Sequence, residues 1–158
     1  MPLSRSSRRA ARGLTAVAIP LGMAAAFALS APAAYARPAG PLPARLLAYA
    51  WAASQTGAPY VYGGTGPGYD CSGLVMMAYR HAGIDLPRTT TAMLASPKLI
   101  RVIHPQMGDL AFYGTGHVEL FRRWGYTFGA HDTGSTVGII RYGLGWVPTA
   151  FYRVKLPG

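Results

Sequence analysis

Apolar residues in the first half of the chain recur at helical spacing. In residues 44–57 they return every three or four positions and the last residue is a glycine, which predicts a helix with a glycine stop. The same spacing over residues 71–82, followed by Gly83, predicts a second helix. Residues 86–94 contain three successive threonines, and we expect a loop there that leads into a short third helix with a threonine cap.

The second half has a different pattern, in which short aromatic or β-branched runs are separated by glycine-containing turns. These runs predict strands of an antiparallel sheet, over residues 108–113, 117–121, 126–131 and 138–142. Helices first and a sheet second indicate the α+β class. With no internal repeat, residues 44–158 are interpreted as one domain, preceded by a Pro/Gly-rich linker over 37–43.

The first 36 residues have the pattern of a secretory signal peptide. Four arginines precede an apolar run over residues 14–29, and a small-x-small site ends at Ala36. The alternative is a membrane anchor, but the run is short for a spanning helix and Pro20 interrupts it. We expect cleavage after Ala36, by general export or, on a weaker motif, the twin-arginine route. The product would be extracellular, without stable membrane insertion.

Net charge excludes little. The chain carries +10, and loss of the signal peptide leaves a charge near +6, because four of the 15 basic residues and none of the 5 acidic ones lie there. The remaining basic residues are scattered, without a nucleic-acid-binding motif, so no nucleic-acid partner is predicted. The surface is either simply soluble or attracted to an anionic surface such as a bacterial envelope. We expect a monomer.

The single cysteine, Cys71, changes the interpretation most. In an exported protein an unpaired cysteine is a buried bystander, an intermolecular link or a reactive thiol. Cys71 falls at the predicted start of a helix, where the helix dipole stabilises a thiolate. Asp70 is a suitable N-cap, and the small Ser72 and Gly73 leave room for a substrate. These neighbours favour a nucleophile.

A nucleophilic thiol needs a base, and His117 is the leading candidate because it opens a predicted strand after a glycine-rich turn. The base needs a group that fixes its orientation. His131 on the next strand could serve, and Asp132 and Glu119 are other polar options, with Glu119 on the same strand face as His117. The lone cysteine and scattered histidines lack a metal-ligand spacing, so we predict no metal and no cofactor.

The order of the motifs resembles the NlpC/p-sixty family of bacterial cell-wall cysteine peptidases. The resemblance covers residues 44–142, and its motifs are "GAPYVYGG", "YDCSGLV", "GIDLPRTT", "MGDLAFY", "GHVELF" and "GAHDTG". It implies a papain-like α+β core, with N-terminal helices packed on an antiparallel sheet and the nucleophile at a helix N-terminus. It also implies cleavage of peptidoglycan stem peptides, often between D-γ-glutamate and a diamino acid.

Matching positions carry the family's roles onto this chain. Cys71 becomes the nucleophile and His117 its base. Asp70 and Ser72 are expected to line the substrate groove. Tyr60 matches a tyrosine near the catalytic thiol, which is either an oxyanion donor or a packed aromatic residue. Separately, Arg88 matches a recurring arginine, for which a structural role is also open.

Two positions depart from the family pattern. Gly129 stands where the third polar residue is expected, and His131 stands two positions on. Residues two apart on a strand point to the same side, so we expect His131 to orient His117. Glu119 stands where the family often has glycine. It could stabilise the imidazolium or lie at the rim of the groove, and the rim is the position we expect.

The sequence therefore predicts a secreted, cell-wall-associated endopeptidase that acts on peptidoglycan through a Cys71, His117 and His131 triad and a thioester. An amidase or acyltransferase with the same residues is an alternative. A catalytically inactive wall-binding module, with Cys71 merely buried, is another. Whether such an enzyme remodels its own wall or attacks a competitor's stays open.

Overall fold

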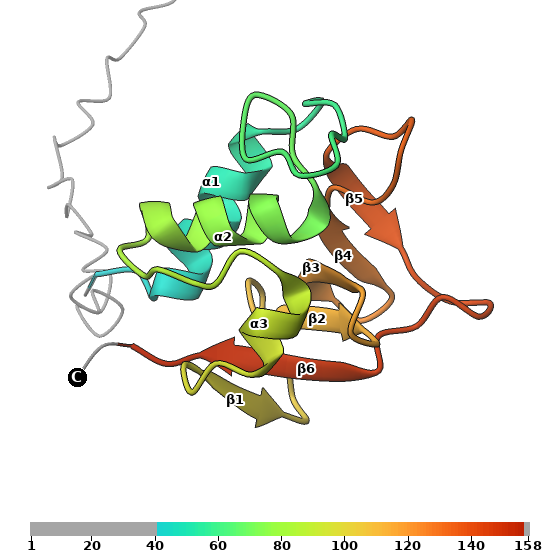
Figure 1. Ribbon diagram of the computed structural model, residues 1–158. Coiled ribbons are helices and arrows are strands. Elements are labelled where there is room, and N and C mark those ends of the chain that lie inside the picture. Colours follow the sequence, from blue (N-terminus) through green and yellow to red (C-terminus); the bar gives the residue numbers. More distant parts are fainter. Residues whose placement is uncertain (1–40, 157–158) are drawn as a thin grey trace, which may run out of the picture. The chain divides into compact units, whose positions relative to one another are not determined.

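The computed structural model describes residues 41–156, which contain three helices and six strands (Figure 1). The expected signal peptide over 1–36 and most of the linker over 37–43 lie outside the described residues. No helix within 41–156 is both long and apolar enough to cross a membrane. The α+β class predicted from the pattern is confirmed.

All three predicted helices are present. They are α1 (Ala44–Ser54), α2 (Cys71–His81) and α3 (Thr90–Leu94). The first ends earlier than predicted because the chain turns after Ser54. The third begins at the predicted threonine cap, since the Thr89 hydroxyl accepts a hydrogen bond from the backbone amide of Ala92. Local capping and turn residues thus set the helix ends.

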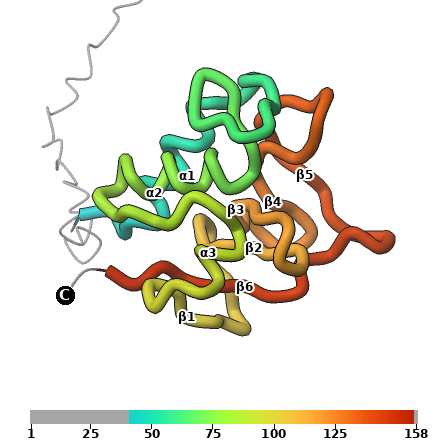
Figure 2. Tube along the Cα trace, in the orientation of Figure 1, coloured from blue at the N-terminus to red at the C-terminus, as the bar shows by residue number. Residues whose placement is uncertain are grey.

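The strands form one antiparallel sheet in the order β1-β6-β2-β3-β4-β5 (Figures 1 and 2). They are β1 (Leu99–Val102), β2 (Leu110–Tyr113), β3 (His117–Arg123), β4 (Tyr126–Gly129), β5 (Gly138–Arg141) and β6 (Ala150–Val154). The four predicted runs become β2 to β5, which follow one another in the sheet in chain order. Each of these four strands pairs with the next strand along the chain, so the local pattern of strands and turns is enough to predict them.

The sequence pattern does not predict β1 and β6. The last strand crosses back to lie between β1 and β2, and most of its residues are only half-buried. It also carries Arg153, whose guanidinium lies 2.6 Å from the fully buried Asp109 carboxylate. This strand does not alternate between apolar and polar residues, and that alternation is the signal by which a strand is predicted from sequence.

Helices α1 and α2 pack on each other, and α2 also packs on β3 and β4. The buried apolar core joins these elements. Its members include Ala48, Ala52, Leu74, Val75, Ala78, Tyr79, Leu110, Phe112, Val118 and Leu120. This packing holds α2 against β3, whose first residue is His117.

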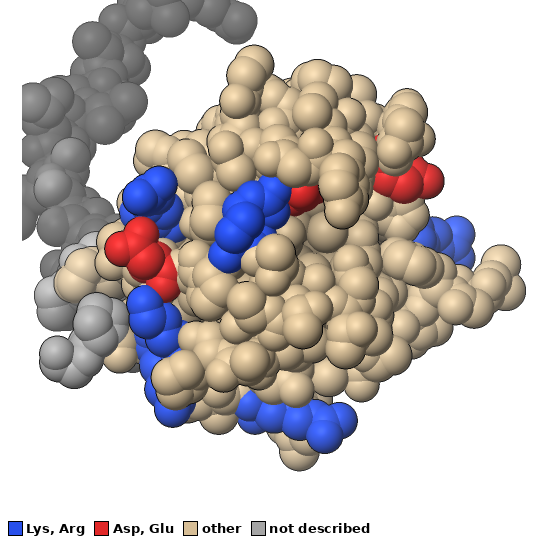
Figure 3. Space-filling model, in the orientation of Figure 1, with Lys and Arg blue, Asp and Glu red and all other residues tan. Residues whose placement is uncertain are grey.

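Basic side chains are distributed rather than clustered. On the face drawn in Figure 3, lysines and arginines lie at several separate places, and at the left edge an acidic group lies between basic ones. The scattered charge seen in the sequence is therefore scattered on this face of the fold as well.

Candidate active site

Cys71 is the first residue of α2, and local contacts hold that end of the helix in place. Asp70 caps it by accepting a hydrogen bond from the Gly73 amide at 2.6 Å. Gly73 has no room for a side chain, because a Cβ there would lie 2.1 Å from the carbonyl oxygen of Gly64. The loop before the helix therefore packs directly on its first turn, and it fixes the position of the thiol.

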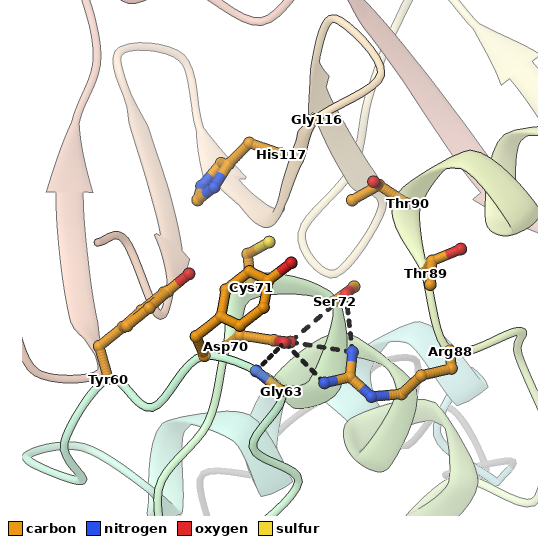
Figure 4. A pocket seen from close by; sticks show the side chains of 11 residues that line it. Tyr60, Gly63, Asp70, Cys71, Ser72, Arg88, Thr89, Thr90, Gly116 and His117 are labelled. Atoms are coloured by element: carbon orange, nitrogen blue, oxygen red, sulfur yellow. Dashed lines mark hydrogen bonds and ion pairs between the residues drawn. The ribbon is translucent and has the colours of Figure 1, made fainter. Parts of the chain in front are cut away.

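The Cys71 thiol and the His117 imidazole line the same groove, close enough for each to shift the pKa of the other (Figure 4). The two residues come from α2 and the start of β3, and Cys71 is buried. The backbone amide of Val118 also acts to lower the pKa of the thiol. Sequence reasoning expected the structure to bring these two side chains together, and it does.

Each group of the pair favours the charged state of the other. Burial raises the pKa of Cys71, but the hydrogen bond and charge of His117 outweigh it and hold the pKa below its ordinary value. Burial likewise lowers the pKa of His117, yet hydrogen bonds to Cys71 and Glu119 raise it to about 9. The arrangement therefore favours a thiolate–imidazolium pair over two neutral groups.

Glu119 is fully buried, so the rim position expected for it is wrong. Its Oε1 lies 2.8 Å from His117 Nε2 and 2.9 Å from His131 Nδ1. Its Oε2 accepts hydrogen bonds from the hydroxyls of Tyr113, at 3.1 Å, and Thr127. Burial raises the pKa of Glu119, but the bonds from His117, His131 and Thr127 outweigh it and lower the pKa. The carboxylate is thus ionised beneath the imidazole.

His131 contacts the same carboxylate and also touches the His117 ring. The two ring centroids lie 5.5 Å apart in an edge-on arrangement. Gly129 leaves room for the Glu119 side chain, because a Cβ at position 129 would lie 2.8 Å from Glu119 Cγ. The Glu119 side chain fills the place that a side chain at position 129 would enter.

Trp146 covers this group from the loop between β5 and β6. Its ring stacks on Tyr113 at a centroid distance of 4.4 Å. Its edge contacts are to His117, at 5.3 Å, and His131, at 5.0 Å. Sequence reasoning missed both Tyr113 and Trp146. No spacing along the chain connects either residue to the predicted catalytic motifs, because only the folded chain places them beside His117.

A groove of about 390 Å³ opens beside the thiol. Its lining includes every residue of the expected catalytic and binding set apart from His131 (Figure 4). The lining residues are Tyr60, Tyr62, Gly63, Asp70, Cys71, Ser72, Arg88, Thr89, Thr90, Gly116 and His117. The groove is therefore open to a peptide-sized ligand next to Cys71.

Asp70 is held on one wall of this groove. Arg88 Nη2 lies 2.6 Å from its Oδ2, and the Gly63 amide donates to the same oxygen at 2.8 Å. Arg88 Nη1 also donates to the Ser72 hydroxyl at 2.9 Å. Burial raises the pKa of Asp70, but the bonds from Arg88, Gly73 and Gly63 outweigh it and lower the pKa. The arginine therefore has a structural role here, and it ties the loop to the helix start.

Tyr60 lines the same groove (Figure 4). Burial raises the pKa of its phenol, and the nearby charge of Cys71 raises it further. The hydroxyl therefore keeps its proton and is able to donate a hydrogen bond.

The sequence model of the NlpC/P60 family matches residues 57–144. The "Bifunctional muramidase/DL-endopeptidase CwlT" of Bacillus subtilis is 35% identical over 110 residues, which cover 63% of this chain and 33% of that protein. The "Probable endopeptidase Cgl2188" of Corynebacterium glutamicum is 34% identical over 138 residues, 85% of this chain and 63% of that protein. The chain thus spans less than two thirds of either relative.

Solved structures show the same fold. The peptidoglycan hydrolase RipB from Mycobacterium tuberculosis superimposes with a TM-score of 0.61 at 26% identity. The match covers 72% of this chain and 66% of that one.

Proposed function

The chain belongs to the NlpC/P60 family, and on that premise we propose that it is a cysteine endopeptidase that hydrolyses peptidoglycan stem peptides. One observation carries the proposal: the Cys71 thiol lies at a helix N-terminus and shares a groove with the His117 imidazole, whose pKa is raised to about 9. The thiol opens on a groove of about 390 Å³. An inactive binding module has no need of such a pair.

The reaction is acyl transfer to water. The thiolate of Cys71 attacks the amide carbonyl carbon, and the C–N bond breaks as His117 gives its proton to the leaving amine. The acyl group then forms a thioester with Cys71. Water attacks this carbonyl while His117 takes a proton from it, and the C–S bond breaks to release the acid and regenerate the thiolate. The Cys71 amide and the Tyr60 hydroxyl are donors for the oxyanion.

The substrate assignment rests on the family resemblance and on what the relatives are named for, a DL-endopeptidase and a peptidoglycan hydrolase. We assign the bond between D-γ-glutamate and the diamino acid of the stem peptide. Export by the residue 1–36 segment would bring the protein to this substrate outside the membrane.

Digestion of defined muropeptides, followed by mass spectrometry, tests the assignment. We expect fragments cut after D-glutamate with the native protein and none with Cys71→Ala. Cleavage at another amide, with the same dependence on Cys71, would replace the bond assignment by an amidase or acyltransferase activity. Equal cleavage by Cys71→Ala would overturn the cysteine mechanism.

A further inference from the structure

The buried carboxylate under His117 has a role that the expected triad does not include. The His117 Nε2 points to Glu119 Oε1 at 2.8 Å, which leaves Nδ1 for the thiol. We propose that Glu119, rather than His131, is the positioning residue of His117, and that its carboxylate takes the place of a side chain at position 129. This inference rests on the proposed cysteine peptidase function.

The surroundings of Glu119 fit a fixed anion. A fully buried carboxylate is costly unless hydrogen-bond donors surround it. Here each oxygen receives two donors, from His117 and His131 on Oε1 and from Tyr113 and Thr127 on Oε2. Because the two hydroxyls come from the neighbouring strands β2 and β4, they prevent rotation of the carboxylate. The oxygen that meets His117 is thereby held in place.

The space beside the His117 ring holds a side chain from position 119 or from position 129, but not both. A Cβ at Gly129 would lie 2.8 Å from Glu119 Cγ, a contact that real side chains do not make. A group that orients His117 can therefore enter from β3 or from β4, but not from both. In this chain it enters from β3, two residues after His117 itself and on the same strand face.

His131 acts on the carboxylate. Its Nδ1 lies 2.9 Å from the oxygen that already meets His117, and about a third of its side chain is exposed. It therefore donates to Glu119, stabilises the anion and covers one side of it. Removing it should weaken the arrangement without removing the bond that orients His117.

The titration of His117 reports this arrangement directly. The titratable groups that face it are Cys71 from α2, Tyr113 from β2, Glu119 from its own strand and His131 from the segment after β4. Removal of the Glu119 charge should lower the imidazolium pKa. A Glu119 whose charge does not act on the imidazole would leave this value unchanged.

The test compares two site variants and two control variants with the native protein. In Glu119→Gln we expect kcat on a muropeptide to fall by about 10²- to 10⁴-fold and the His117 pKa, followed by NMR of the ring protons, to fall from about 9. In His131→Gln we expect about a tenfold loss at most. The exposed His104→Gln and Asp85→Asn serve as matched controls with native activity.

A relocation variant separates positioning from folding. Glu119→Gly alone should lose activity, and Glu119→Gly with Gly129→Glu should regain most of it, because the carboxylate then enters from β4. Native kcat and native His117 pKa in Glu119→Gln, or a larger loss in His131→Gln, would overturn the proposal. The NMR titration needs no substrate, so it tests Glu119 even if native protein cleaves no muropeptide, a result that would count against the proposed function alone.

Discussion

At the scale of single residues, the site depends on Glu119, which is fully buried against the His117 ring and not at the rim expected from the sequence. The strand period correctly put Glu119 on the face of His117. It could not show that Gly129 on the adjacent strand leaves a space that the Glu119 side chain fills. The space around a side chain depends on the residues of the neighbouring strand. The alternation of residues along one strand does not show which residues those are.

The charge state of the pair predicts how Cys71 reacts with pH. Because the pKa of Cys71 is lowered by His117, alkylation by iodoacetamide should begin below pH 9.0, the ordinary value for the thiol. Removal of the imidazole in His117→Ala should move this onset to higher pH. Stopped alkylation followed by peptide mass spectrometry measures it. A native onset near the ordinary thiol value would contradict the ion pair.

Trp146 packs against His117 and His131, and its removal should change the activity and the pKa of His117. Trp146→Ala would admit water to the bond between His117 and Glu119 and weaken it. We expect kcat/KM to fall about tenfold and the His117 pKa to move from about 9 toward 6.5. The control is Trp124→Ala, since Trp124 is exposed and packs on Phe121 and Phe151. Equal effects of both substitutions would mean that Trp146 does not shield the site.

At the scale of elements, helices and hairpins were predictable and the crossover was not. The four strands β2 to β5 follow one another, so each carries its own alternation and its own turn. The pairing of β6 with β1 and β2 joins segments far apart in the chain. The partners of β6 depend on the whole sheet. The ion pair of Arg153 with Asp109 forms only because β6 lies beside β2 in the folded sheet.

The start of α2 predicts a stability effect. Asp70→Ala would remove the helix cap and leave Arg88 and the Gly63 amide without their acceptor. We expect a loss of about 2–4 kcal/mol in the free energy of unfolding, measured by urea denaturation. The control is Asp85→Ala, whose ion pair with Arg80 is exposed and should contribute at most about 1 kcal/mol. Equal losses in the two variants would contradict the role assigned to Asp70.

The same carboxylate predicts a pH dependence of stability. Burial raises the pKa of Asp70, but the bonds from Arg88, Gly73 and Gly63 hold it below the ordinary 3.8. Its contribution is therefore complete above pH 3.8 and is lost as pH falls through the lower, folded-state pKa. Asp70→Asn should flatten this acid limb in denaturation curves. An unchanged acid limb would mean that other carboxylates cause it.

At the scale of the whole molecule, the fold brings three separate segments together at His117. The helix start supplies the thiol, the β3 strand supplies the imidazole with its carboxylate, and the loop before β6 supplies the Trp146 cover. The thiol and the imidazole lie in local motifs, so the sequence predicts them as nucleophile and base. We propose that these segments act together to form a thioester on Cys71.

The most direct test is to detect that thioester. A muropeptide is mixed with the native protein, the reaction is quenched in acid, and the protein is mapped by mass spectrometry. We predict an acyl group ending in D-glutamate on Cys71, together with the free amine of the released diamino acid. Cys71→Ala should give neither product. Release of the amine with no adduct on Cys71, at equal rates in the native protein and Cys71→Ala, would contradict the account.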